Sequence, residues 1–273
     1  MQIPFIKMHG LGNDYVYIDC FPAETATLLN DVNLSELARH ISNRHTGVGS
    51  DGLVLIMPSQ TADVHMRMFN ADGSEAQMCG NASRCVAKYA YEQGLCGESM
   101  TLETLAGIKN ITLRTSSQGR VEQVTVNMGK PIVKECCRLL YDNAIHPYSS
   151  VNIGNPHAVV IANQPLEQLP LTTIGPIWEH HPDFPEGTNV EFVHIINRKE
   201  IAMRVWERGS GETMACGTGA CAVAAALFAL GDSDNEVTVH LKGGDLQIRI
   251  EDNTVYMTGT ATEVFRGTYN WEE

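Results

Sequence analysis

The chain has 273 residues, of which 43% are hydrophobic and 19% charged, a composition typical of a folded globular protein. Its formal net charge of -13 argues against nucleic acid or an anionic membrane as a partner, because both reward a basic surface. The sequence contains no apolar run long enough to span a membrane and no signal-peptide pattern at its start, so we expect a cytoplasmic protein. Its length suits two domains, each large enough to bury its own core.

The first half of the chain is predicted to be rich in strands and to hold two helices. Apolar residues in 33–43 recur at the spacing of one helical face, which predicts an amphipathic helix. A second helix is predicted over 82–92, behind the glycine-rich loop that ends at Cys79. Residues 132–148 are the least patterned, so we place the domain boundary near residue 130. Alternating apolar residues and turn signals predict strands over 3–8, 14–20, 53–57, 64–69, 99–104, 108–115 and 121–128.

The second half repeats this order of elements. An Ala-rich helix follows Cys216 and ends at Gly231, and a shorter helix is predicted over 172–180. A doubly wound parallel sheet would need a helix after nearly every strand, and the helices are too few for that. Strands are predicted over 151–162 with a break at 154–157, and over 189–196, 200–205, 236–241, 246–251, 254–260 and 264–269.

We therefore predict an α+β fold of two pseudo-symmetric lobes, each a strongly curved, mostly antiparallel sheet around a central helix. The N-terminal lobe would span residues 1–130 and carry Cys79. The C-terminal lobe would span residues 131–273 and carry Cys216. We leave open whether the last strand returns to the N-terminal lobe.

An internal repeat supports the division into two lobes. Met66 and Cys79 are separated by the same interval as Met203 and Cys216, and the second pair lies half a chain further on. Several such coincidences in the same order make chance a poor explanation. Arg67 and Arg204, which match each other in the repeat, lie in predicted strands, and we expect them to be structural ion-pair partners. The other matches pair Gly12-Asn13 with Gly154-Asn155, Arg67 with Arg204, and Glu75 with Glu212.

Each of the two repeated cysteines stands at the start of a helix. Unpaired backbone N–H groups and the helix dipole favour negative charge there, so we expect the position to lower the thiol pKa. The next cysteines, Cys85 and Cys221, follow at intervals wider than the usual spacing of zinc ligands, and we expect no metal. The remaining cysteines have no recognisable context and are interpreted as structural thiols: Cys20, Cys96, Cys136 and Cys137.

Two thiols of this kind suit one type of reaction. If the lobes are related by a pseudo-twofold axis, both helix starts point into one cleft, with a thiolate on one face of a substrate carbon and a thiol on the other. Removing a proton from one face and returning one to the other inverts a stereocentre. The helix N-termini would also bind a carboxylate that gains charge as the α-proton leaves. No lysine has the setting of a pyridoxal phosphate site, so the residues favour a cofactor-free amino-acid racemase or epimerase.

Several motifs resemble those of diaminopimelate epimerase, almost from end to end of the chain. The two cysteine loops are the most specific part, with 69–75 leading into Cys79-Gly80-Asn81 and 207–213 leading into 215–219. One departure stands at Ser50-Asp51-Gly52, where many relatives have Phe-Asp-Gln and the Gln contacts substrate. The remaining matches are Lys7-Met8-His9-Gly10-Leu11-Gly12-Asn13-Asp14, Asn127-Met128-Gly129-Lys130-Pro131 and Gly154-Asn155-Pro156-His157.

The resemblance implies interconversion of LL- and meso-2,6-diaminopimelate for lysine and peptidoglycan synthesis, by a homodimer without a cofactor. It implies that Cys79 is the proton donor and Cys216 the acceptor in the LL direction. The amides at Gly80-Asn81 and Gly217-Thr218 would hold the reacting carboxylate, and His157 would lie just behind the substrate contacts. The amino and carboxylate groups of the substrate would be bound by Asn13, Asn70, Asn155, Asn189, Glu207 and Arg208.

Two other functions stay open at this point. A proline or hydroxyproline racemase would share the fold, but a proline ring has no second amino-acid end for Asn70, Asn155, Asn189 and Arg208 to bind. A catalytically silent small-molecule binder, or a redox-sensing dithiol protein, would not need both cysteines at glycine-rich helix starts. The sequence therefore favours the epimerase.

Overall fold

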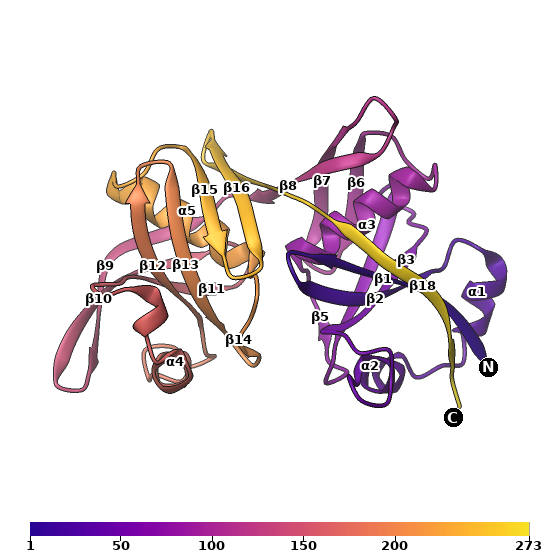
Figure 1. Cartoon of the computed structure of the whole chain (residues 1–273), viewed down its shortest axis with the longest axis horizontal. Coiled ribbons are helices and arrows are strands. Elements are labelled where there is room, and N and C mark those ends of the chain that lie inside the picture. The colour runs from indigo at the N-terminus through magenta and orange to yellow at the C-terminus, as the bar shows by residue number, and fades with distance from the viewer. Residues whose placement is uncertain (273) are drawn as a thin grey trace. The chain divides into compact units, whose positions relative to one another are not determined.

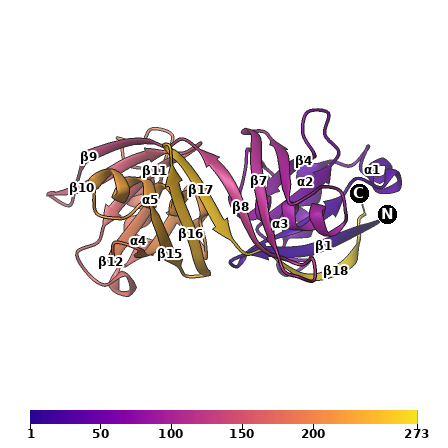
Figure 2. The ribbon, with the colours of Figure 1, turned by 90° about the horizontal axis from the view of Figure 1, so that it is seen from above.

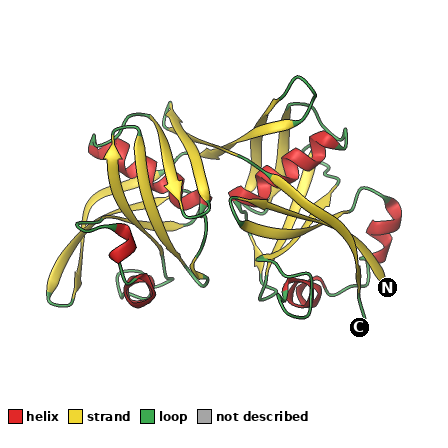
Figure 3. Ribbon diagram, in the orientation of Figure 1, coloured by secondary structure: helices red, strands yellow, loops and turns green. Residues whose placement is uncertain are grey.

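The computed structural model of the protein describes residues 1–272, and the chain divides into two compact units. Unit 1 contains Met1–Val126 together with the C-terminal residues from Gly259 onward, and unit 2 contains Asn127–Thr258. Strands make up most of both units, and helices are few (Figure 3). The structure confirms the predicted α+β class.

Unit 1 is one mixed sheet with the strand order β18-β1-β2-β3-β4-β6-β7-β8. The pairs β2–β3 and β4–β6 are parallel, and the other neighbours are antiparallel. Short β5 forms a hairpin with β4. The elements are β1 (Gln2–Gly10), β2 (Asn13–Asp19), α1 (Ala23–Leu28), α2 (Leu34–Ser42), β3 (Gly52–Met57), β4 (Val64–Asn70), β5 (Glu75–Ala76), α3 (Gly80–Glu92), β6 (Ser99–Thr104), β7 (Gly107–Thr115), β8 (Val121–Gly129) and β18 (Thr262–Asn270).

Unit 2 repeats this topology, with the strand order β9-β10-β11-β12-β13-β15-β16-β17. Its parallel pairs, β11–β12 and β13–β15, occupy the positions of β2–β3 and β4–β6, and β14 forms the matching hairpin with β13. The elements are β9 (Ile132–Tyr141), β10 (Ala144–Asn152), β11 (Pro156–Ile161), η1 (Leu166–Gln168), α4 (Leu171–Glu179), β12 (Asn189–Asn197), β13 (Glu200–Glu207), β14 (Gly211–Glu212), α5 (Gly217–Leu230), β15 (Glu236–Leu241), β16 (Gly244–Glu251) and β17 (Thr254–Gly259).

Each sheet curves around its central helix, α3 in unit 1 and α5 in unit 2 (Figures 1 and 2). Helix α5 is apolar on almost every face, and such a helix is stable only when it is enclosed. It contacts β9, β10, β11, β12, β15 and β16, so strands cover most of its circumference. Gly231, at φ 79°, ends the helix in the left-handed conformation that glycine adopts without strain.

The outer face of each sheet carries the crossover helix that joins two parallel strands. In unit 1, Leu37, Ala38 and Ile41 of α2 are fully buried in a cluster with residues of β1, β2 and β3. In unit 2, Leu171 and Trp178 of α4 pack in the same way against β11 and β12. The predicted helices over 33–43, 82–92 and 172–180 are thus confirmed as α2, α3 and α4.

The repeated arginines form the expected ion pairs. Arg67 of β4 contacts Glu75 of β5 at 2.8 Å, and Arg204 of β13 contacts Glu212 of β14 at 2.9 Å. Each pair joins the two strands of a short hairpin, β4–β5 or β13–β14, that precedes a cysteine. Arg204 also donates to the Leu169 carbonyl at 3.0 Å, which ties the second hairpin to the segment before α4.

The weakly patterned stretch 132–148 is a long hairpin of β9 and β10, which the sequence analysis did not predict. Its alternation is blurred because most of β9 is solvent exposed and because a bulge interrupts the pairing near Cys136, whose φ is 56°. The turn at Asp142-Asn143 has positive φ at both residues, a geometry that favours a tight two-residue hairpin. Helix α1 was also missed.

We predict that Arg204→Met destabilises the protein more than Arg67→Met. The Arg67–Glu75 pair is one-third exposed, so its loss should cost at most about 1 kcal/mol. Loss of Arg204 also leaves the Leu166 and Leu169 carbonyls without that donor, which should cost about 1–3 kcal/mol. Urea unfolding of the two variants beside the wild type measures both costs, and equal costs would contradict a role for the two carbonyls.

Candidate functional site

Cys79 caps the start of α3 in unit 1. Its backbone is extended, at φ -135° and ψ 123°, and Gly80 is the first helical residue. The half-buried thiol donates to Asn13 Oδ1 at 3.5 Å, and the same oxygen accepts a hydrogen bond from Asn81 Nδ2 at 3.1 Å. The structure therefore brings Asn13, Cys79, Gly80 and Asn81 together, and we call them the Cys79 half-site.

Cys216 occupies the matching position at the start of α5 in unit 2. Its Sγ accepts a hydrogen bond from the Gly219 amide at 3.4 Å and lies 3.5 Å from the Thr218 hydroxyl. Asn155 donates to that hydroxyl at 3.4 Å. A Cβ atom on Gly219 would lie 3.2 Å from the sulfur, so glycine allows the helix start to approach the thiol closely. These residues, with Gly217, form the Cys216 half-site.

The expectation that a helix start lowers the thiol pKa is wrong for Cys216. Burial raises its pKa well above the ordinary value, because the side chain is only 4% exposed and a charged sulfur would lose its water. The nearby Glu207 and Glu191 carboxyls raise the pKa further, while Thr218 and the Gly219 amide lower it less. In the free protein Cys216 is therefore a thiol at neutral pH.

A buried cluster of ionisable groups surrounds Cys216. His157, 1% exposed, contacts Glu191 Oε1 through Nδ1 at 2.7 Å and Asn155 Oδ1 through Nε2 at 2.9 Å. Burial raises the pKa of the Glu207 carboxyl, while hydrogen bonds with Thr213 and Cys216 oppose that shift. His157 thus lies directly behind Asn155, and Glu207 lies beside the thiol.

Three other residues that the resemblance implies lie at the ends of strands. Asn189 accepts from the Arg208 amide at 3.0 Å and donates to the Pro156 carbonyl at 2.8 Å, so it links the start of β12 to β11 and to the residue after β13. The exposed Arg208 side chain donates to the Glu186 carbonyl at 3.1 Å. Asn70 donates to Ser74 Oγ at 3.0 Å in the loop after β4, and no hydrogen bond described for its side chain reaches the Cys79 half-site.

The departure at Gly52 has a structural cause. A Cβ atom there would lie 2.1 Å from the Phe69 carbonyl oxygen, so no larger residue fits this backbone. The preceding residue, Asp51, accepts from Asn13 Nδ2 at 2.8 Å. The sequence analysis did not assign a role to Asp51 or to Glu191. The available signal for Glu191 was a glutamate in the middle of the apolar stretch 190–193.

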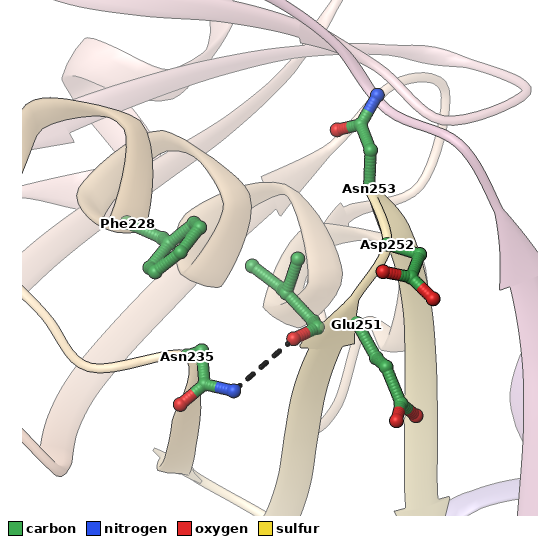
Figure 4. A pocket seen from close by; sticks show the side chains of 6 residues that line it. Phe228, Asn235, Glu251, Asp252 and Asn253 are labelled. Atoms are coloured by element: carbon green, nitrogen blue, oxygen red, sulfur yellow. Dashed lines mark hydrogen bonds between the residues drawn. The ribbon is translucent and has the colours of Figure 1, made fainter.

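One hollow lies elsewhere in unit 2, near the end of α5 (Figure 4). It has a volume of about 490 Å³, and Phe228, Glu251, Asp252 and Asn253 are among its lining residues. The Asn235 amide in its wall is already bound to the Ile250 carbonyl at 3.3 Å. The lining holds no thiol and two carboxylates, so it does not suit proton transfer next to a bound carboxylate.

Within residues 1–272, no cluster of three or more histidine, cysteine or acidic side chains is placed to hold a metal ion. No helix in the described part of the chain has the length and apolar character needed to cross a membrane.

Solved structures define the class of fold. A phenazine biosynthesis protein of the PhzF family from Bacillus anthracis aligns with a TM-score of 0.74 and 17% identity, over 98% of this chain and 99% of that one. A probable proline racemase from Agrobacterium radiobacter aligns with a TM-score of 0.73 and 19% identity, over 97% and 92%. At these identities the likeness shows the fold alone, a fold that this chain shares with amino-acid racemases and epimerases.

Sequence comparison assigns the chain to one family within this class of fold. A diaminopimelate epimerase from Acetivibrio thermocellus is 50% identical over 285 residues, 98% of this chain and 99% of that one. A diaminopimelate epimerase from Methanococcus maripaludis is 49% identical over 281 residues, 96% of this chain and 98% of that one. The sequence profile of the diaminopimelate epimerase family matches residues 5–134 and 149–264, and the chain belongs to this family. The resemblance noted in the sequence is confirmed.

We predict that Glu207→Gln makes Cys216 more reactive toward iodoacetamide. Removing one of the carboxylates that raise the thiol pKa should lower that pKa by about one unit, which increases the thiolate fraction about tenfold below the midpoint. Mass spectrometry of the Cys216 peptide across a pH series measures the rate. Glu200→Gln, at the far end of the same strand, is the matched control and should leave the rate unchanged. An unchanged rate in Glu207→Gln would show that Glu207 does not raise the thiol pKa.

Proposed function

We propose that this protein interconverts LL- and meso-2,6-diaminopimelate without pyridoxal phosphate, for lysine and peptidoglycan synthesis. One observation carries the proposal: a member of the diaminopimelate epimerase family has a cysteine at the start of the enclosed helix in each of its two units. Two equivalent thiols suit a reaction whose forward and reverse directions exchange the acid and the base.

In the LL direction, Cys216 would remove the α-proton and Cys79 would return one to the opposite face. The Cα–H bond breaks, its proton passes to Cys216 Sγ, and its electron pair spreads into the adjacent carboxylate. The Cys79 S–H bond then breaks, and its proton forms the new Cα–H bond. The enzyme leaves the reaction with the two cysteines in exchanged protonation states.

The carboxylate beside the reacting carbon needs stabilisation as it gains charge. We expect the amides at Gly80-Asn81 and Gly217-Thr218 to supply it, since the N–H groups of a first helical turn point out of the helix and favour an anion. The absence of a side chain at Gly217 leaves room for a carboxylate near the backbone. The amides are held by the helices, so they need little reorganisation during the reaction.

The raised pKa of Cys216 makes its thiolate a strong base once it forms. An α-proton is weakly acidic, so a base that burial destabilises has more driving force to remove it. The substrate's α-ammonium group would oppose the charge of Glu207 and Glu191 and so lower the thiol pKa on binding. Deprotonation of Cys216 would then be coupled to occupancy of the site.

The ends of the substrate carry amino and carboxylate groups that need oriented polar partners. We propose that Asn13, Asn155, Asn189, Glu207 and Arg208 bind these groups, with Asn70 as a further contact. The support is chemical: amide side chains donate and accept, the guanidinium of Arg208 is exposed, and the Glu207 carboxyl can accept from an ammonium group.

The function is tested by α-proton exchange in D2O, followed by NMR with reduced protein free of pyridoxal phosphate. LL-diaminopimelate should gain deuterium and invert. Cys79→Ala and Cys216→Ala should each slow inversion by about 10²- to 10⁴-fold, the range expected for loss of a general acid or base. Cys221→Ala, in the same helix as Cys216 and fully buried, is the matched control and should retain activity.

The same experiment includes L-proline as a competing substrate. Exchange into proline alone would keep the two-thiol mechanism and overturn the substrate. Exchange into neither compound would favour a binding protein. Inversion that persists in either cysteine variant would contradict the two-base mechanism.

We also propose that the protein is a cytoplasmic homodimer. Light scattering behind size-exclusion chromatography should give twice the mass of the chain, and the value should hold over a tenfold dilution. A single-chain mass at every concentration would contradict this proposal.

A further inference from the structure

A row of charged side chains lies behind the Cys79 half-site. Lys7, only 7% exposed, contacts the Asp14 carboxylate and the Gly49 carbonyl. Arg44 bridges Asp14 and Asp51, with one nitrogen 2.8 Å from an oxygen of each. Asp51 ends the row, because its other oxygen accepts from Asn13 Nδ2 at 2.8 Å and from the Asp14 amide at 3.0 Å.

This arrangement determines which way the Asn13 amide points. An ionised carboxylate only accepts hydrogen bonds, so the Asn13 nitrogen must face Asp51 and its oxygen must face α3. The contact with Asn81 indicates the same orientation of the Asn13 amide independently. Arg84 only donates, and it donates to Asn81 Oδ1 at 2.9 Å, so Asn81 turns its nitrogen toward Asn13. The acceptor oxygen of Asn13 is therefore held against Cys79 from both sides.

A hydrogen-bond acceptor beside Cys79 affects the protonation of its thiol. Asn13 Oδ1 can accept a hydrogen bond from S–H and has no proton to offer to S⁻, so it favours the protonated form. The other half-site differs, because Cys216 meets a donor, the Gly219 amide, as well as the Glu207 carboxyl, and Asn155 donates to the Thr218 hydroxyl. The two half-sites thus share a backbone and differ in the polar groups that meet sulfur.

We propose that Asp51 is a positioning residue, which holds the Asn13 side-chain oxygen against Cys79 and so keeps that thiol protonated. The catalytic part of this inference rests on the proposed function, in which a protonated Cys79 is the proton donor in the LL direction. The hydrogen bonds themselves stand without it.

Other titratable groups near Cys79 do not supply this effect. Tyr17 of β2 and Cys85 of α3 interact with it electrostatically, and burial raises the pKa of Tyr17 well above its usual value and that of Cys85 to about 11. Both are neutral at neutral pH. Arg84 of α3 is a permanent cation that lowers the pKa of Cys85, so it favours a thiolate there and does not supply the effect assigned to Asn13.

The test is the pH dependence of iodoacetamide modification at Cys79 in the ligand-free protein, followed by peptide mass spectrometry. In Asp51→Asn the carboxylate that holds the Asn13 amide from one side is lost, so only Asn81 restrains the amide and its N–H groups can turn toward sulfur. We expect the midpoint for Cys79 to fall by about one pH unit, so that modification below the midpoint becomes about tenfold faster. The midpoint for Cys216 should stay unchanged, which makes it an internal control.

Arg44→Gln is the matched control, because it removes the ion pair at Asp51 and leaves the oxygen that accepts from Asn13. Its Cys79 midpoint should equal that of the wild type. Rapid modification of buried Cys20 and Cys85 would show that a variant has unfolded unit 1, and Asp51→Ser then replaces Asp51→Asn with the same expected direction. A wild-type midpoint in a folded Asp51 variant, or an equal shift in Arg44→Gln, would overturn the proposal.

The alkylation experiment contains no diaminopimelate, so its outcome is separate from that of the proposed function. If the substrate is diaminopimelate, Asp51→Asn should lower kcat in the LL direction, and a change in KM would report on the contact between Asn13 and substrate. If the midpoint shifts while diaminopimelate is not turned over, the positioning role stands and the substrate is wrong. An unchanged kcat despite a shifted midpoint would overturn the catalytic meaning of the positioning.

Discussion

The need to enclose an apolar helix, α5, organises unit 2, and a helix that is buried over most of its length, α3, has the same place in unit 1. Helix α5 has no polar face to turn toward water, so the strands of unit 2 must wrap around it, and α3 is covered in the same way. Wrapping leaves the start of each helix as the place where backbone N–H groups point out of the helix. At its helix start Cys216 meets both a dry surrounding and the oriented Gly219 amide, whereas Cys79 is half-buried and meets the Asn13 amide oxygen. The position of the chemistry follows from the burial of the helix.

The two copies of this arrangement share a backbone plan but not an electrostatic one. Cys216 lies among Glu207, Glu191 and His157, so its protonation depends on charges that are themselves buried. Cys79 instead meets a neutral amide whose direction is set by Asp51. The repeat gives two similar cysteine positions, and the residues around each make them unequal.

Much of the fold could be predicted because strong local patterns and the repeat agreed. The helix starts followed from matching one half of the chain to the other, and so did a structural ion-pair role for Arg204, although its partner, Glu212, was not predicted. The β9–β10 hairpin could not be predicted, since its exposed, bulged strands lack alternation. The pKa of Cys216 was predicted in the wrong direction, because the helix dipole is visible in sequence, whereas the burial that outweighs it depends on tertiary packing.

The pairing of β18 with β1 has a consequence for the order of folding. Strand β1 lies between β2 and β18, and the amino group of Met1 donates to the Trp271 carbonyl. Unit 1 therefore cannot complete its sheet until residues 262–270 have been synthesised, although its other strands emerge from the ribosome first. Unit 2 is continuous in sequence and can fold earlier. During translation, the unit that is made first would be the one that is finished last, with the edge of β1 unprotected in the interval.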